Sequence, residues 1–315
     1  DHGVRSGVVI VARNIIVLVL LLVAPLPVLA GPGLSISVVE EGADFWGDIA
    51  DPGRQRFVAA MNKGQALYRS ATTSPSHLSP ALLEELLREG TGRDHGQLRL
   101  AAMNSALASF QEAVKVSPVR ADGHLWLGKA RYMLAHMAPR GGREGALHDA
   151  ALMTQAAASY TRARELSPAL LEDYDVAFEM AIIHSSQGKL KAAVMEYERA
   201  ERIVAASEQL SPKKRQKRAR VQGNAAECLM GLGRLEEAIQ RYQEALSLGY
   251  DATINHWGLA VALDRDEQQD KALYHARRAM SRDRTMKALT NPSIFFVPDG
   301  ELHYYFAVGH LAQGK

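Results

Sequence analysis

Cysteine is nearly absent from the chain, because Cys228 is the only one among 315 residues. A single thiol cannot form an internal disulfide, so the fold must be held together by packing. Without any Cys-x-x-Cys pair, metal and redox sites built on sulfur are excluded. Cys228 lies in the middle of a helical pattern, and we therefore predict a buried, small hydrophobic residue rather than a reactive thiol.

The sequence also lacks the motifs of common catalytic sites. It contains no Walker-type phosphate loop, no G-x-S-x-G nucleophile elbow and no H-E-x-x-H metal motif. Among its eleven histidines, His303 and His310 are seven residues apart on one expected helix, about 10 Å, which is too far for one shared ion. His256 occupies the equivalent place in the preceding repeat. All three histidines are predicted to be packed, neutral core residues. We predict no enzyme, no metal and no cofactor.

Positive and negative charges nearly balance, because the formal net charge is only +2. That balance gives no reason to expect nucleic acid as a partner. Aromatic residues make up 6% and hydrophobic residues 47% of the chain. This composition is typical of an Ala- and Leu-rich helical protein in which small side chains lie at close helix contacts.

Only the N-terminus contains a long hydrophobic run. Arg5 and Arg13 precede an unbroken apolar stretch over 15–24, and small residues follow at Val28 and Ala30. This layout predicts a signal peptide over residues 1–30, because a membrane span needs roughly 20 apolar residues. An anchor formed by residues 8–30 is the alternative. We expect an exported protein of the periplasm or cell envelope, with residues 31–56 as a flexible leader.

The remaining chain carries a recurring stripe of small and aromatic residues. An Ala is followed by an aromatic residue four positions later and by another Ala after three more, a spacing that places all three on one helix face. Another helix, which has a small residue at its centre, precedes each stripe by about twelve residues and is the first helix of a pair. The four full copies of the stripe are Ala106/Phe110/Ala113, Ala156/Tyr160/Ala163, Ala193/Tyr197/Ala200 and Ala238/Tyr242/Ala245.

This two-helix unit resembles the tetratricopeptide repeat (TPR), most clearly over 219–249. The resemblance implies an all-α fold, a right-handed α-solenoid of antiparallel helix pairs over residues 57–315. We expect five TPR-like pairs followed by one further helix over 302–314, in a solenoid that is truncated at its C-terminal end. An intervening loop with an apolar centre, 294–297, is either tucked onto the solenoid or a docking site. The five expected pairs are 57–116, 122–166, 173–205, 214–248 and 253–281.

In this family the first helix of each pair lines the inner curve, and the resemblance implies a binding groove there. Two rows on the first helices, three residues before and one residue after the central small residue, should line it. The clamp that chaperone-binding members use for a terminal carboxylate is not supported, because the matching positions lack its Lys, Arg and Asn. The predicted partner-binding residues are Leu125, Lys129, Phe178, Ile182, Glu227, Trp257, Val261 and Tyr304. For Trp257, packing between repeats is the competing interpretation.

A basic run follows Ser211-Pro212 and extends the next first helix. Ser211 can cap this helix, and Pro212 can take its first position. The run is either a solvated surface or a contact for an anionic surface, such as lipid head groups, an envelope polymer or an acidic partner. Its cations include Lys213, Lys214, Arg215, Lys217 and Arg218.

Two hypotheses of function follow. The first is a non-catalytic scaffold or adaptor of the cell envelope that binds hydrophobic or amphipathic segments of partner proteins. Those partners would belong to an envelope assembly, secretion or motility complex. The second is an accessory repeat region of an enzyme whose catalytic domain lies beyond Lys315.

Overall fold

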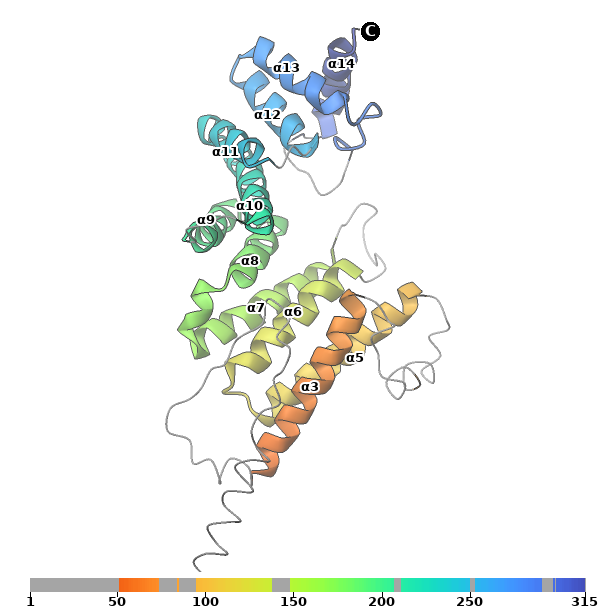
Figure 1. Ribbon diagram of the computed structural model, residues 1–315, viewed down its shortest axis with the longest axis vertical. Coiled ribbons are helices and arrows are strands. Elements are labelled where there is room, and N and C mark those ends of the chain that lie inside the picture. The colour runs from red at the N-terminus through yellow and green to blue at the C-terminus, as the bar shows by residue number, and fades with distance from the viewer. Residues whose placement is uncertain are drawn as a thin grey trace, which may run out of the picture. The chain divides into compact units, whose positions relative to one another are not determined.

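The computed structural model is helical throughout the part of the chain that it describes, which is residues 51–73, 84, 95–137, 148–206, 211–249, 253–290, 297 and 299–314. These residues form eleven α-helices and two short 3₁₀ helices (Figure 1). The α-helices are α3 (Pro52–Thr72), α5 (His95–Val116), α6 (Ala121–Met137), α7 (Ala150–Leu166), α8 (Tyr174–Ser186), α9 (Leu190–Ala205), α10 (Pro212–Gly231), α11 (Leu235–Ser247), α12 (Thr253–Arg265), α13 (Gln269–Met280) and α14 (Leu302–Ala312). The 3₁₀ helices are η2 (Pro168–Glu172) and η3 (Asp299–Glu301).

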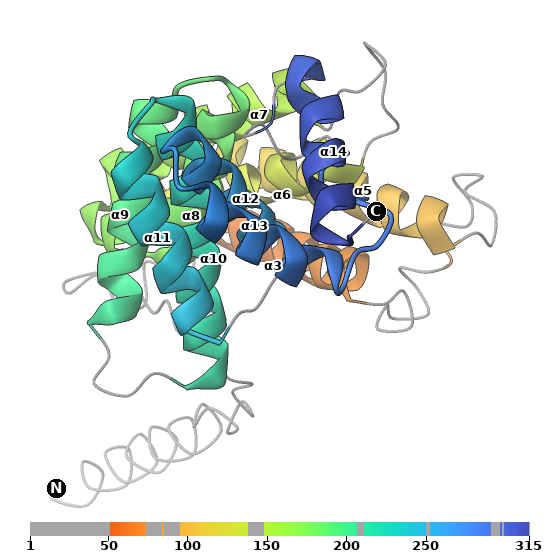
Figure 2. The same cartoon turned by 90° about the horizontal axis from the view of Figure 1, so that it is seen from above.

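The helices pack as sequential antiparallel pairs. α3 pairs with α5, α6 with α7, α8 with α9, α10 with α11, and α12 with α13, and α14 packs on α13 (Figures 1 and 2). The five pairs and the additional helix that the sequence predicts are thereby confirmed. The pairs also contact each other in chain order, most extensively between α9 and α10 and least between α7 and α8.

Within a pair, a small residue of the first helix packs against an aromatic ring of the second. A Cβ atom on Gly128 of α6 would lie 2.7 Å from Cε1 of Tyr160 in α7. A Cβ on Gly64 of α3 would lie 2.5 Å from Cε1 of Phe110 in α5. Both distances are too short for an alanine without displacement of the ring. The stripe in the sequence is therefore the packing face of each second helix.

The turn between the helices of a pair has a constant register. Gly188, Gly233 and Glu267 have φ values of 70°, 73° and 59° and follow α8, α10 and α12. This left-handed conformation favours glycine and ends a helix by satisfying its last carbonyl groups. In each case the central small residue of the first helix lies seven positions earlier, at Ala181, Ala226 and Ala260.

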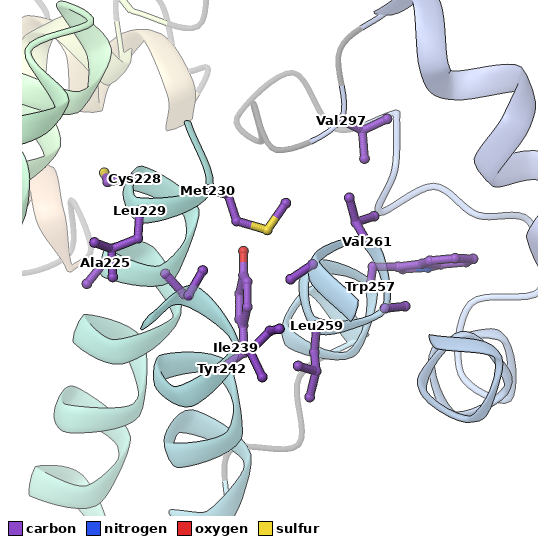
Figure 3. Close-up of a cluster of buried hydrophobic side chains, with 14 of the residues drawn as sticks. Ala225, Cys228, Leu229, Met230, Ile239, Tyr242, Trp257, Leu259, Val261 and Val297 are labelled. Atoms are coloured by element: carbon purple, nitrogen blue, oxygen red, sulfur yellow. The ribbon is translucent and has the colours of Figure 1, made fainter. Parts of the chain in front are cut away.

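The buried side chains form three hydrophobic clusters along the helix pairs. One joins α3, α5 and α6, and another joins α6, α7, η2 and α8. The third extends from α8 to α14 and contains Trp257, Tyr242 and Cys228 (Figure 3). Cys228 is fully buried, as predicted, and burial raises the pKa of its thiol to about 12.

The start of α10 follows the signals in the sequence. Ser211 is the N-cap, its Oγ accepts a hydrogen bond from the backbone N–H of Lys214 at 3.3 Å, and Pro212 is the first helical residue. This prediction is confirmed. A hydroxyl at the cap satisfies one backbone donor that the helix itself leaves unpaired.

Two histidine predictions are wrong. His303 and His310 are exposed on α14, because no described helix packs over that side of α14 in the way that second helices cover the other first helices. His256 is buried, as expected, and its Nδ1 lies 3.0 Å from Nδ1 of His275. Of the apolar loop over 294–297, only Val297 is described, and it is buried in the third cluster.

The predicted signal peptide or anchor, residues 1–30, and most of the predicted leader, residues 31–56, lie outside the described residues, which begin at Asp51. Among the helices that are described, none combines the length and the hydropathy that a membrane span requires.

Candidate partner-binding face of the first helices

Four of the eight predicted partner-binding residues are core residues. Leu125 is 3%, Phe178 7%, and Trp257 and Val261 are 0% exposed. Leu125 belongs to the cluster shared with α8, whereas Phe178 packs edge-on against Tyr197 of α9 at 5.9 Å between ring centroids. The prediction that these four side chains lie open to a partner is therefore corrected.

Burial of Trp257 has a specific cause, which is the close approach of α14. A Cβ on Gly309 of α14 would lie 3.2 Å from Cη2 of Trp257 and 2.5 Å from Sδ of Met286. Figure 3 shows the indole on the side of α12 that faces away from Tyr242. At Trp257, the row three residues before the small residue thus contacts the next first helix rather than solvent.

The other four predicted residues reach the surface. Lys129, Ile182 and Glu227 are half-buried on α6, α8 and α10. Tyr304 of α14 is 51% exposed, and its hydroxyl donates a hydrogen bond to Oδ1 of Asp264 at 3.1 Å. The residues one position after the small residue are therefore partly exposed in α6, α8 and α10. The equivalent residue of α12, Val261, is buried in the core.

A second set of residues, which the sequence analysis missed, surrounds Lys129 and Glu179. Tyr68 of α3 meets Trp126 of α6 edge-on, with ring centroids 5.4 Å apart, and Trp126 stacks on Phe110 at 5.6 Å. Nζ of Lys129 lies 5.9 Å from the centroid of the Trp126 ring. None of Tyr68, Trp126 and Lys129 is fully buried. Three large side chains from two first helices therefore share one partly exposed surface.

Glu179 of α8 interacts electrostatically with Tyr68 and Lys129 of this set. The hydroxyl of Tyr160, from α7, donates a hydrogen bond to Oε2 of Glu179. Burial raises the pKa of the Glu179 carboxyl to about 7, the charges of Asp175 and Asp173 raise it further, and Lys129 and the Tyr160 hydrogen bond oppose the shift. The carboxyl group is therefore only partly ionised near neutral pH.

Electrostatics connect Glu179 to three neighbouring helices. Burial raises the pKa of Tyr68 and of Tyr132, and the charge of Glu179 raises both further. The charge of Arg220, from α10, lowers the pKa of Tyr132. Charges on α8 and α10 thus act on tyrosines of α3 and α6. We call this set the first-helix face, and it consists of Tyr68, Trp126, Lys129, Tyr132, Glu179 and Arg220.

The first-helix face follows a register that the sequence displays. Trp126 and Glu179 lie two residues before the central small residue, and Tyr68 and Tyr132 lie four residues after it. The sequence feature that could have revealed this face is the presence of polar residues in the middle of first helices, such as Asn62, Glu179 and Asn224. Polar side chains are usually exposed rather than buried in a core.

The basic run is partly neutralised within the fold. Nζ of Lys217 lies 3.0 Å from Oδ1 of Asp175 and 4.0 Å from the centroid of the Tyr174 ring. Arg218 pairs with Glu201 at 2.6 Å and also with Glu244. These two residues therefore form ion pairs with α8, α9 and α11, and their contact with an external anionic surface stays a prediction. Lys213, Lys214 and Arg215 are exposed at the start of α10.

Among the described residues, no group of three or more His, Cys, Asp or Glu side chains is arranged to hold a metal ion. His256 and His275 form only a pair, and burial lowers the pKa of His275 to about 4, with the charges of His256 and Arg278 adding to the effect. The contacts that the described surface offers include aromatic contacts, hydrogen bonds and ion pairs.

Replacement of Glu179 by glutamine is expected to change how stability depends on pH. A carboxyl whose pKa is raised in the folded state stabilises that state below the unfolded value of about 4.5, and this contribution is lost as the pH rises through 7. Between pH 5 and pH 8 the wild-type chain should lose more stability than Glu179→Gln. Urea unfolding at four pH values measures the difference, and parallel curves for the two proteins would contradict it.

The sequence comparisons agree with this architecture. Residues 219–248, which comprise most of α10 and all of α11, match the family model of the tetratricopeptide repeat. The chain therefore contains a tetratricopeptide repeat at this place, and its other helix pairs repeat the same architecture. No curated protein matches the sequence.

Solved structures of tetratricopeptide proteins resemble the chain. YrrB, described as a TPR protein with an unusual peptide-binding site, is 16% identical, with a TM-score of 0.48 over 74% of this chain and 96% of YrrB. A MamA protein is 14% identical, with a TM-score of 0.45 over 74% of this chain and 94% of that one. MamA from Desulfovibrio magneticus RS-1 is 17% identical, with a TM-score of 0.46 over 71% and 97% of the two chains.

Proposed function

We propose that the chain is a non-catalytic scaffold that binds a hydrophobic or amphipathic segment of a partner protein on the first-helix face. The observation that supports this most is that three large aromatic side chains of first helices, Tyr68, Trp126 and Tyr132, are partly exposed, and that Tyr68 and Trp126 contact each other. Equivalent rings on the second helices, such as Tyr160, are fully buried, whereas these three pack against the hydrophobic clusters and keep part of their surface exposed.

Binding on this face would combine two kinds of contact. Trp and Tyr supply large, rigid contact areas at little cost in conformational entropy, and they are common among the residues that dominate binding energy. Glu179, Lys129 and Arg220 add polar groups of both signs around the rings. A segment with an apolar side chain and a flanking hydrogen-bond donor fits such a surface.

A panel of peptides selected by phage display against the whole chain tests this function. Peptides that bind the wild-type chain should bind Trp126→Ala at least ten-fold more weakly, because truncation of an aromatic anchor costs on the order of 2 kcal/mol or more. Met195→Ala is the matched control, since Met195 is 67% exposed on α9, a second helix. Equal losses in both variants, or no loss in either, would reject the first-helix face.

We further propose that the protein is exported and acts in the periplasm or cell envelope, within an assembly, secretion or motility complex. The charged, apolar and small-residue segments over 1–30 support export, and the exposed Lys213 and Arg215 could contact anionic lipid or envelope polymer. N-terminal sequencing of the protein from envelope fractions should give Gly31 as the first residue. An intact N-terminus in a cytoplasmic fraction would contradict export.

A further inference from the structure

Each carboxyl group at the start and in the first two turns of α8 has a partner within the fold. Asp173 is the N-cap of the helix, and its Oδ1 accepts a hydrogen bond from a backbone N–H of the first turn at 3.0 Å. Oδ1 of Asp175 lies 3.0 Å from Nζ of Lys217, and Oε2 of Glu179 accepts a hydrogen bond from the hydroxyl of Tyr160. The acidic side chains of this helix are therefore engaged before any partner binds.

The two cations of the first-helix face lie over aromatic rings instead of beside carboxylates. Nζ of Lys129 lies 5.9 Å from the centroid of the Trp126 ring, and Cζ of Arg220 lies 5.1 Å from the centroid of the Phe178 ring. Neither cation forms an ion pair with any residue that the structure describes. A ring attracts a cation without engaging most of its N–H donors, so these donors stay available to a partner.

Both cations act on the same turn of α8. Burial raises the pKa of the Glu179 carboxyl to about 7, and the charge of Lys129, on the preceding first helix α6, opposes that shift. Arg220, on the following first helix α10, contacts the ring of Phe178, which directly precedes Glu179. Glu179 is only partly ionised near neutral pH, and the other members of the first-helix face are uncharged aromatic residues. The charge of this face is therefore positive in sum.

From this charge balance, and on the basis of the proposed function, we infer that the segment bound on the first-helix face presents acidic side chains, Asp or Glu, to Lys129 and Arg220. They flank the apolar side chain that contacts Trp126. A carboxylate of the partner gives each cation the ion pair that the fold does not provide, and such charge-assisted hydrogen bonds fix the position of the segment. Because the two cations belong to first helices on either side of α8, they are matched by side chains within a segment that runs across α8 rather than by one chain terminus.

Anionic lipid is a less suitable counterpart for these two cations. Lys129 is half-buried and lies over Trp126, so a side chain of a bound segment reaches it more readily than a flat surface of head groups does. Lys213, Lys214 and Arg215, which are exposed at the start of α10, do not belong to this face. A protein segment is therefore the occupant.

Random peptides displayed at the N-terminus of a phage coat protein, and selected on the whole chain, serve as the probe, because they have no free carboxyl terminus. The selected peptides should contain Asp and Glu more often than the unselected library. Their affinity should fall by about three- to ten-fold with Lys129→Gln and with Arg220→Gln. Lys213→Gln and Arg215→Gln make the same substitutions at exposed positions of α10 outside the face and should leave the affinity unchanged.

Two further measurements assign the loss to charge rather than to a structural change. Added NaCl should weaken peptide binding to the wild type more than to the variant that combines Lys129→Gln with Arg220→Gln. Replacement of the peptide's Asp and Glu by Asn and Gln should weaken binding to the wild type but not to that double variant. All variants should keep the thermal midpoint of the wild type, because Lys129 and Arg220 pair with no carboxylate in the fold.

The outcomes separate this inference from the proposed function. Peptides that lose affinity with Trp126→Ala but keep it with both Lys129→Gln and Arg220→Gln would overturn the inference alone. Peptides that ignore Trp126→Ala, or a failure to select any peptide, would reject the first-helix face and the inference with it. Retention of the chain on vesicles of phosphatidylcholine and phosphatidylglycerol that both glutamine variants abolish, with peptide binding unaffected, would assign the two cations to lipid and overturn the inference.

Discussion

Replacement of Trp257 by alanine should lower the free energy of unfolding by about 3–5 kcal/mol, the usual cost of truncating a fully buried aromatic residue. The indole is 0% exposed and packs against α14 at Gly309, where Met280 and Met286 also lie. Its removal would leave a cavity between α12 and α14 that these side chains can only partly refill. Thermal and urea unfolding both measure the loss.

Two further variants assign the loss to ring packing. Trp257→Phe keeps an aromatic ring and removes an indole N–H that has no hydrogen-bond acceptor among the described residues, so it should lose far less. Tyr304→Ala truncates a residue of the same sequence row that is 51% exposed, and it should change stability little. If Trp257→Ala unfolds at the wild-type midpoint, Trp257 belongs to a surface and the packing of α14 on α12 is wrong.

Breaking the ion pair between Arg164 and Glu196 should have the second largest effect. Arg164 of α7 donates two hydrogen bonds, of 2.8 and 2.9 Å, to the carboxylate of Glu196 in α9, and the two side chains are 9% and 12% exposed. Glu196→Gln leaves the guanidinium largely buried without its counterion, at a cost of about 3 kcal/mol or more. The pair also joins α7 to the following helix pair where direct contact between α7 and α8 is sparse.

A double-mutant cycle with urea unfolding measures the coupling between the two residues. Arg164→Met together with Glu196→Met should recover most of the loss, because the most buried charge is then removed. Arg199, which also pairs with Glu196 at 3.0 Å, is 26% exposed and can be solvated by water. Arg162 and Glu165, also on α7, form a matched exposed pair with side chains 48% and 57% exposed, and Arg162→Ala should cost less than about 1 kcal/mol. A cost as small for Glu196→Gln would mean that the buried pair does not form.

The helix pairs could be predicted because their signals are local. Stripes such as Ala238/Tyr242/Ala245 and turns such as that at Gly233 recur at nearly constant spacing, and each refers to contacts inside one pair. η2 was missed, because its five residues fill the space between α7 and α8 without any periodic pattern.

The candidate site could be predicted only in part, because it depends on how one pair stacks on the next. The sequence places Lys129 and Glu227 on the surface of first helices, where the structure has them. It does not reveal that Phe178 contacts Tyr197, or that α14 covers Trp257. The angle between neighbouring pairs decides which of two adjacent rows is buried, and this angle arises from the summed packing of many side chains. Glu179 was missed although the sequence shows a polar residue there, in the middle of a first helix.

Site-specific photo-crosslinking in the source organism is the most direct test of partner binding on the first-helix face. A photoreactive phenylalanine replaces Tyr132 in one strain and Met195, on the outward side of α9, in another. The account predicts a discrete crosslinked species from position 132 that disappears when Trp126→Ala is present, and no such species from position 195. The same species from both positions, or its persistence with Trp126→Ala, would contradict partner binding on the first-helix face.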